Sequence, residues 1–337
     1  MRRRRTILVV GAVMGVLVGL GIWRLLDHDL DRHTAEPLEF TVDGQTVAGT
    51  LWRPAGDPRA VVALVHGDGP QDRTSAGGYA PLINVLLDAD LAVASWDKPG
   101  IGGSAGNWLD QSMEDRTAEL RAALATLGGE GVPLGVLGFS QAGWVVPGLE
   151  AGAADFLVLV GAAVSWQRQG RYYTRTRLER EGLTPEAVDA AMADVATDNA
   201  RLFGPDAQYD AGALGGLSEA RWHFIRRNRN SDATAALGAL TLPTLAVWGA
   251  EDLNVDPRAN SAKYAVLLGE RHPESRIMLI PEATHGLLKA GPYNHQLVEN
   301  WPLSAKIRFL WEGRHAFAPG ALTALTGWID AQLSPPR

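Results

Sequence analysis

The sequence predicts an α/β protein in which a mainly parallel central sheet is covered by helices. Short, continuous apolar runs, such as 60–65 and 91–96, alternate with segments of helical periodicity, such as 116–127. Apolar runs of this kind fit strands buried on both faces, and strands that alternate with helices pair in parallel through right-handed crossovers. This rhythm stops at about residue 165 and resumes at about residue 245, which predicts an inserted helical segment.

The predicted elements follow in chain order. A hairpin comes first, 38–42 and 46–53, because Asp43-Gly44 suits a tight turn between two strands. The further predicted strands are 60–65, 91–96, 133–139, 155–160, 245–248 and 276–280. Helices are predicted at 79–87, 116–127 and 321–333, and from Gln141 onward. Pro147 fits the last of these poorly, because proline lacks an amide hydrogen.

The inserted segment, 165–240, is predicted to be a helical cap that divides the core into 38–164 and 241–337. Three polar stretches in it have helical spacing, 167–181, 185–203 and 218–228. Thr184-Pro185 suits a helix start, with threonine as cap and proline in the first turn. Aromatic residues in or near the cap either pack it onto the core or line an apolar pocket: Trp144, Trp166, Tyr172, Tyr173, Trp222 and Phe224.

The N-terminal residues predict a membrane anchor. A basic tail, 1–5, precedes a nearly uncharged segment, 6–26, which is long enough to cross a bilayer. Four arginines before the segment favour a cytoplasmic N-terminus and place the rest of the chain outside the cytoplasm. A cleaved signal peptide, which would give a secreted protein, is the alternative, although no good small-x-small site follows. Residues 27–37 are expected to be a linker.

Composition excludes several classes of function. A chain of 337 residues with 46% hydrophobic residues fills one large domain with an insertion. The net charge is −7 and the basic residues beyond the N-terminus are scattered, which argues against nucleic-acid binding. The chain has no cysteine, so disulfides, thiolate metal sites and a cysteine nucleophile are excluded.

Ser140 is the predicted nucleophile. It lies in the sequence GFSQAG, between the apolar strand 133–139 and a segment competent to form a helix. Serine on a sharp strand-to-helix turn, flanked by small residues, is typical of a nucleophile elbow. Ser104, in GGSAG, fits the literal G-x-S-x-G pattern better, but no apolar strand precedes it and no periodic helix follows. Ser104 is therefore interpreted as part of a glycine-rich loop.

An acid and a base follow Ser140 in the expected order. A serine nucleophile needs a base, usually histidine, held by a carboxylate, and in this kind of sheet both come from loops after later strands. Asp252 follows the strand at 245–248, and His285 follows the last strand. We predict His285 as general base and Asp252 as the residue that orients it, with Glu251 and Asp256 as competitors of Asp252.

Two backbone amides are predicted to form an oxyanion hole. The first belongs to Gln141, directly after the nucleophile. The second belongs to the loop HGDGP after the strand 60–65, where Asp68 is preferred and Gly67 is the alternative. His66 is expected to pack within this loop and not to act as a second base.

Two motifs carry a resemblance to a known family. Residues 66–73 read HGDGPQDR, and residues 97–104 read DKPGIGGS. Over 38–333 the chain resembles the α/β-hydrolase family, and its first motif resembles a bacterial serine hydrolase or esterase branch with an H-G-[SD]-G-P-x-D-R loop. The resemblance implies the α/β-hydrolase fold and hydrolysis without a metal or organic cofactor. It also gives Ser104 a structural place in the second motif.

The family's functional residues map onto four positions. Its nucleophile, oxyanion donor, acid and base correspond to Ser140, Gln141, Asp252 and His285. The chain departs from the family pattern at Ala142, where many members have glycine. It departs again in the second motif, where lysine and proline replace the common arginine and glycine.

The sequence therefore predicts a membrane-anchored serine hydrolase that cleaves small-molecule carboxylic esters through an acyl-enzyme. A peptidase or a thioesterase with the same triad remains open, because one constellation serves all acyl transfers. A non-catalytic, membrane-tethered binding protein is the alternative of a different class. Residues 292–320 have no assigned role and are interpreted as a second lid element or a membrane-facing surface.

Overall fold

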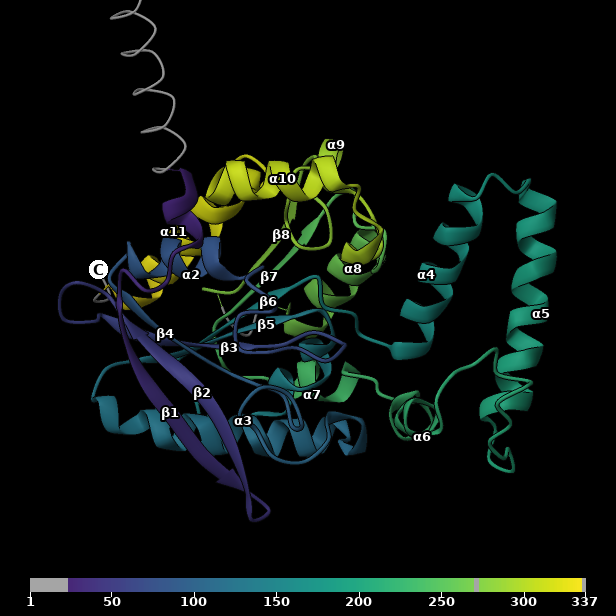
Figure 1. Cartoon of the computed structure of the whole chain (residues 1–337), viewed down its shortest axis with the longest axis horizontal. Coiled ribbons are helices and arrows are strands. Elements are labelled where there is room, and N and C mark those ends of the chain that lie inside the picture. The colour runs from purple at the N-terminus through teal and green to yellow at the C-terminus, as the bar shows by residue number, and fades with distance from the viewer. Residues whose placement is uncertain (1–23, 270–272, 335–337) are drawn as a thin grey trace, which may run out of the picture.

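A computed structural model describes residues 24–269 and 273–334, and an eight-stranded sheet lies at its centre (Figure 1). The strand order is β1-β2-β4-β3-β5-β6-β7-β8. The first two pairings are antiparallel and all the others are parallel, which confirms the predicted mainly parallel sheet. The strands are β1 Thr34–Val42, β2 Gln45–Arg53, β3 Ala60–Val65, β4 Leu91–Trp96, β5 Leu134–Phe139, β6 Phe156–Val160, β7 Thr244–Gly249 and β8 Arg276–Ile280.

Helices cover both faces of this sheet. α3 (Met113–Leu127), α7 (Thr234–Ala239) and α8 (Pro257–Leu268) pack on one face, and α2 (Ala80–Leu87) and α11 (Ala321–Leu333) pack on the other. Every residue of β3, β4, β6 and β7 is buried between the two layers. The continuous apolar runs of the sequence arise from this double coverage.

Two predicted boundaries are wrong. β1 begins at Thr34, so the last part of the predicted linker, 27–37, is already strand. The helix predicted from Gln141 is instead two short 3₁₀ turns, Ser140–Trp144 and Val146–Gly148. Pro147 lies in the second turn, and it cannot donate the backbone hydrogen bond that an α-helix would require there.

Helices fill the chain between β6 and β7, and the first three of them lie to one side of the sheet (Figure 1). They are α4 (Trp166–Arg180), α5 (Pro185–Phe203) and α6 (Glu219–Asn228), followed by α7. Thr184 caps α5 by accepting a hydrogen bond from the amide of Ala187, as its position before Pro185 suggests.

Aromatic side chains attach this segment to the core. The ring of Trp166 lies 5.1 Å from that of Trp144, and the ring of Phe224 lies 5.3 Å from that of Trp108. Trp222 is buried and donates a hydrogen bond to the carbonyl of Leu202. The sequence allowed these aromatic residues either to pack the cap onto the core or to line a pocket, and these contacts show packing.

The C-terminal part adds α9 (Ala290–Tyr293) and α10 (Leu303–Glu312), and near the start of the described chain lies a single turn, η1 (Leu26–His28). Among the residues that the structure describes, no helix has the length and apolar character needed to cross a bilayer. The predicted anchor, 6–26, falls almost entirely on residues outside the described part, so it stays a prediction.

Candidate active site

Ser140 directly follows β5 in a left-handed backbone conformation, with φ of 51°. A residue other than glycine in this region carries roughly 1–3 kcal/mol of strain, which persists only where the surroundings impose it. A Cβ atom at Gly138 would lie 2.8 Å from the Cβ of Ala142, so the turn requires a residue without a side chain there. This strained, tightly packed turn is the geometry that a nucleophile elbow needs.

Asp252 and His285 form a hydrogen-bonded pair. The Nδ1 atom of His285 lies 2.7 Å from Oδ2 of Asp252, whose side chain is fully buried. The other oxygen, Oδ1, accepts hydrogen bonds from the amides of Asn254 (2.7 Å) and Val255 (2.9 Å). The carboxylate is therefore satisfied on both oxygens, and its orientation toward the imidazole is fixed.

The two competing carboxylates are placed elsewhere. Asp256 caps α8, because its Oδ1 accepts hydrogen bonds from the amides of Arg258 and Ala259. Glu251 is exposed, and its amide donates to the carbonyl of Ala283. Within the described structure, neither carboxylate makes a hydrogen bond with the imidazole of His285.

The sheet register places the predicted nucleophile, Ser140, at the level of the imidazole. Phe139 pairs with Val160, so Ser140 and Gly161 leave two adjacent parallel strands at the same level. Adjacent strands lie about 4.8 Å apart. A Cβ atom at Gly161 would lie only 2.8 Å from the imidazole of His285. The ring thus lies over Gly161, at the sheet level of Ser140, and the described contacts include no hydrogen bond between Oγ and the ring.

The electrostatics of the pair suit a general base. Burial by itself would lower the pKa of His285, but the charge and the hydrogen bond of Asp252 together outweigh it, so the pKa lies above the ordinary value of 6.5. When the neutral ring donates its Nδ1 hydrogen to the carboxylate, Nε2 is left as the proton acceptor. The buried carboxylate of Asp252 therefore also favours the protonated form of the imidazole, as a general base requires.

The two predicted oxyanion donors lie together. Neither the amide of Gln141 nor that of Asp68 donates a hydrogen bond within the part of the chain that the structure describes. A Cβ atom at Gly67 would lie 3.3 Å from the Cβ of Ser140, so this loop contacts the nucleophile. Nε2 of Gln141 also donates to Oδ1 of Asp68 at 3.1 Å, which links the two donor residues through their side chains.

A buried lysine fixes the orientation of one of these amides. Nζ of Lys98 donates to the carbonyl oxygens of Gly67 (2.5 Å) and Gly69 (2.9 Å), and the residue is only 2% exposed. A trans peptide is planar, so the Gly67 carbonyl and the Asp68 amide point in opposite directions. With its carbonyl held by Lys98, this peptide directs the Asp68 amide away from the lysine. Burial holds the pKa of Lys98 well below its usual range.

Arg116 on α3 holds the preceding carbonyl of the same loop. Its Nη2 donates to the carbonyl of His66 at 2.7 Å, and its Nη1 donates to Oε1 of Gln141 at 2.6 Å. The guanidinium therefore connects the loop after β3 to the residue that follows the nucleophile. In the sequence, Lys98 is visible only as a departure from the family motif, and Arg116 has no visible role, because no local pattern shows which distant carbonyls they reach.

His66 and Ser104, which were not predicted to be catalytic, have structural roles. Nε2 of His66 lies 2.6 Å from the carbonyl of Trp96, and burial, with help from nearby cations, lowers the pKa of this histidine to about 3. Oγ of Ser104 donates to the carbonyl of Asp97 (2.7 Å) and accepts from the amide of Ala48 (2.9 Å). Both side chains are buried and committed to loop packing.

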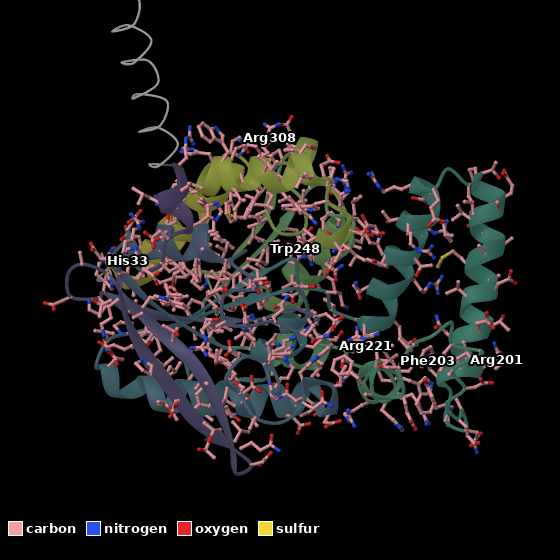
Figure 2. All side chains as sticks on the ribbon, in the orientation of Figure 1. His33, Arg201, Phe203, Arg221, Trp248 and Arg308 are labelled. Atoms are coloured by element: carbon pink, nitrogen blue, oxygen red, sulfur yellow. The ribbon has the colours of Figure 1, made fainter. Side chains whose placement is uncertain are left out.

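The inserted helices contact the site at two points. Arg221 on α6 lies between the core and the outer helices (Figure 2) and pairs with both carboxylate oxygens of Asp68, at 3.0 and 2.5 Å. Its guanidinium also stacks on Trp108 and Phe224. On α4, the hydroxyl of Tyr172 donates to the backbone carbonyl of Asp252 at 2.7 Å. Sequence reasoning missed both contacts, because they join segments far apart in the chain.

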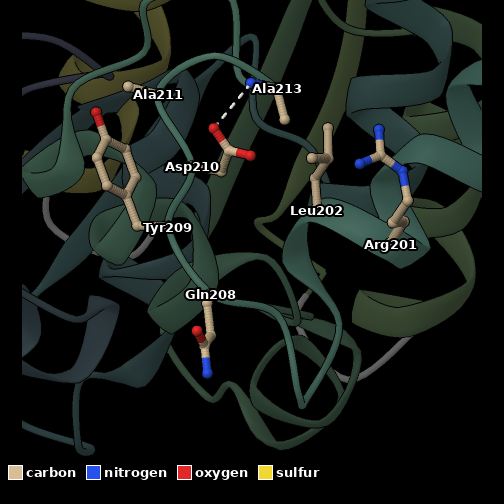
Figure 3. Close-up of a pocket in the computed structure, with 7 residues that line it drawn as sticks. All are labelled: Arg201, Leu202, Gln208, Tyr209, Asp210, Ala211 and Ala213. Atoms are coloured by element: carbon tan, nitrogen blue, oxygen red, sulfur yellow. Dashed lines mark hydrogen bonds between the residues drawn. The ribbon is translucent and has the colours of Figure 1, made fainter.

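A separate cavity of about 660 Å³ lies where α5 ends and the following loop begins, between residues 201 and 213 (Figure 3). In its wall, Oδ1 of Asp210 accepts a hydrogen bond from the amide of Ala213 at 3.2 Å. None of the five predicted site residues lines this cavity. It is therefore not part of the candidate active site.

Comparisons with known proteins address the family and the fold of this chain. The model of a family described as "Serine aminopeptidase, S33" matches residues 56–290, which is more than half of the chain. No curated protein sequence matches.

Three solved structures illustrate the shared fold. An esterase from Pyrococcus furiosus is 15% identical, with 90% of this chain and 94% of that chain covered and a TM-score of 0.55. An esterase from Thermogutta terrifontis is 17% identical, with 89% and 100% covered and a TM-score of 0.51. A proline iminopeptidase from Mycobacterium smegmatis is 16% identical, with 83% and 99% covered and a TM-score of 0.51. At these identities the likeness shows the fold alone.

Proposed function

We propose a serine-hydrolase function for this chain, which belongs to the serine aminopeptidase family of α/β hydrolases. Membership makes it a hydrolase, and the finer proposal is that it cleaves small-molecule carboxylic esters with Ser140, His285 and Asp252. One observation carries the proposal. The imidazole, held at 2.7 Å by the buried carboxylate, lies over Gly161 at the level of the strained serine turn.

In the proposed reaction, neutral His285 takes the proton of the Ser140 hydroxyl as its oxygen attacks the ester carbonyl carbon. The amides of Gln141 and Asp68 donate to the developing oxyanion. The tetrahedral intermediate expels the alcohol, which receives the proton from the imidazolium. Water then attacks the acyl-enzyme with the same base, and the carboxylic acid leaves while Ser140 regains its proton.

The two carboxylates among the predicted site residues are already paired, which favours a neutral ester over a substrate with a free amino group. A substrate ammonium would need an available carboxylate. Asp68 is already paired with Arg221, and Lys98 and Arg116 lie behind the same loop. Asp252 is fully buried and committed to His285. The description of the family keeps a peptidase as the second candidate, and a thioesterase uses the same chemistry.

Covalent labelling and a substrate panel test this proposal. A fluorophosphonate probe should label the wild-type chain at Ser140 and fail to label Ser140→Ala. Ser104→Ala is the matched control, because Ser104 is a buried loop residue, and the folded fraction of this variant should keep the label. Labelling of Ser140→Ala would contradict Ser140 as the nucleophile and indicate another one. No labelling of the wild type would contradict the hydrolase proposal and favour a binding protein.

The panel compares p-nitrophenyl esters, acyl thioesters and aminoacyl nitroanilides. We expect the highest kcat/KM for the esters. A higher value for the nitroanilides would replace the esterase proposal with a peptidase while leaving the triad intact.

We also propose that residues 6–26 tether the hydrolase to a membrane, with the catalytic domain outside the cytoplasm. Four preceding arginines and the nearly uncharged sequence of this segment support the proposal. Release of the full chain from membranes by high salt or carbonate would contradict an anchor. A mature protein lacking these residues would indicate a cleaved signal and secretion.

A further inference from the structure

The outer face of α10 is apolar. Four large side chains on this helix are between 49% and 72% exposed: Leu303, Ile307, Leu310 and Trp311. At 3.6 residues per turn these positions form one stripe along the helix. The opposite side carries Ala305 and Phe309, which pack against Tyr293 and its neighbours. Apolar side chains therefore lie on both sides of α10, whereas an ordinary surface helix presents a polar side to solvent.

The apolar surface extends beyond the helix. Leu297 and Val298 precede α10 and are 48% and 62% exposed. Among the described residues, eight of the eleven large exposed apolar side chains lie in 25–26 or 297–311. Scattered apolar residues are normal on a protein surface, but a concentrated group marks a contact with another surface or a membrane.

The described chain begins beside this helix. Nε2 of His28 lies 3.3 Å from the carbonyl of Phe309, and the two rings meet edge to face at 5.3 Å. Oδ1 of Asp27 accepts a hydrogen bond from Nε of Arg314 at 2.6 Å. The turn η1 and α10 therefore lie on the same side of the molecule (Figure 1). The apolar sequence that precedes Arg24 joins the domain at the edge of the exposed stripe.

Basic residues flank the stripe. Lys306 and Arg308 are exposed on α10, and Arg308 lies at the outer edge of the molecule (Figure 2). Arg308 also pairs with Glu312 at 2.8 Å. Basic residues near an apolar face favour anionic lipid headgroups, and tryptophan prefers the membrane–water interface. An apolar stripe with tryptophan and basic neighbours fits a phospholipid surface better than the core of a protein–protein interface.

We propose that residues 297–311, which we term the α10 face, rest on the surface of an anionic phospholipid bilayer. The segment before Arg24 enters that bilayer beside the face, and the helix lies in the plane of the interface with its apolar stripe toward the acyl chains. Two attachments, one spanning and one lying on the surface, fix the orientation of the domain. This inference depends on the N-terminal tether and not on which acyl group the enzyme cleaves.

The absence of cysteine allows a site-specific test. Ile307→Cys places a single thiol in the stripe, and Thr41→Cys places one on β1 near the hairpin turn, at the opposite end of the view in Figure 1. Both native residues are exposed, so each change should leave the fold intact. Each full-length variant is labelled with an environment-sensitive fluorophore. It is then reconstituted in equimolar phosphatidylcholine and phosphatidylglycerol vesicles, with or without a nitroxide-bearing lipid.

We expect the label at 307 to shift to shorter wavelength and to be quenched by the nitroxide lipid, while the label at 41 does neither. If the chain floats with the vesicles but the label at 307 is not quenched, the α10 face does not contact the bilayer. If the label at 307 shifts without quenching and the shift weakens on dilution, a second copy covers the face. A shift independent of dilution would indicate cover by the N-terminal segment. A chain that does not float overturns the tether and the face together.

Discussion

The substitution Gly161→Ala tests the position of the His285 imidazole directly. Gly161 has φ of 62°, and a Cβ atom there would lie 2.8 Å from both Cε1 and Nδ1 of the His285 imidazole. Ordinary contacts between such atoms begin at about 3.5 Å, so the ring must move by about 0.7 Å. The ring also carries the hydrogen bond to Asp252, so the displacement disturbs the base and its orienting residue together.

The substitution should affect two quantities, the stability of the fold and the rate of catalysis. An alanine in the left-handed region destabilises the fold by roughly 1–2 kcal/mol. A misplacement of a catalytic group by about 1 Å costs about 10²-fold in rate, which corresponds to about 2.7 kcal/mol of transition-state stabilisation. Gly152→Ala is the matched control, because Gly152 has φ of 83° and a Cβ atom there would meet no other atom within 4 Å.

Gly161→Ala should therefore lower Tm at least as much as Gly152→Ala, and only Gly161→Ala should lower kcat for a p-nitrophenyl ester. Thermal unfolding and steady-state kinetics on the same preparations measure the two effects. If Gly161→Ala kept the kcat of Gly152→Ala, the imidazole of His285 would not be the base at the position the structure gives it.

Three further predictions follow from the same contacts. Asp252→Asn should lower kcat by about 10⁴-fold in a protein that still folds, and a smaller loss in steady-state assays would favour another orienting carboxylate. Because the pKa of His285 is raised and the base must be neutral, kcat/KM should fall as the pH drops through a value above 6.5. In Asp252→Asn this acidic limb should move to lower pH, because burial then lowers the pKa of His285 without the opposing charge of Asp252. Lys98→Met should leave two carbonyls without their donor, at about 1–3 kcal/mol each, and should lower kcat toward the 10²- to 10³-fold cost of one oxyanion donor. A lower Tm with unchanged kcat would show that Lys98 stabilises the loop without positioning the Asp68 amide.

The sequence was most informative where local rules decide the structure. The start of α5 was predictable because Thr184 and Pro185 supply the cap and the first turn, and the buried strands were predictable from their uninterrupted apolar runs. The helix after Ser140 was mispredicted because Pro147 breaks it into two turns. The α10 face was left without a settled role, because an exposed apolar stripe looks in sequence like an ordinary buried one.

The chain order of a nucleophile, an acid and a base, each after a strand, was readable without coordinates, because parallel strands bring their carboxyl ends to one edge of a sheet. The sequence favoured Asp252 as the partner of His285 but left Glu251 and Asp256 as competitors, because the three share one loop and only tertiary packing turns one of them toward the ring. The cations behind the oxyanion loop were equally hidden, because Lys98 reaches carbonyls about thirty residues away. Periodicity and turn chemistry act between near neighbours in the chain, whereas charge pairing and amide orientation depend on distances that exist only once the sheet has formed.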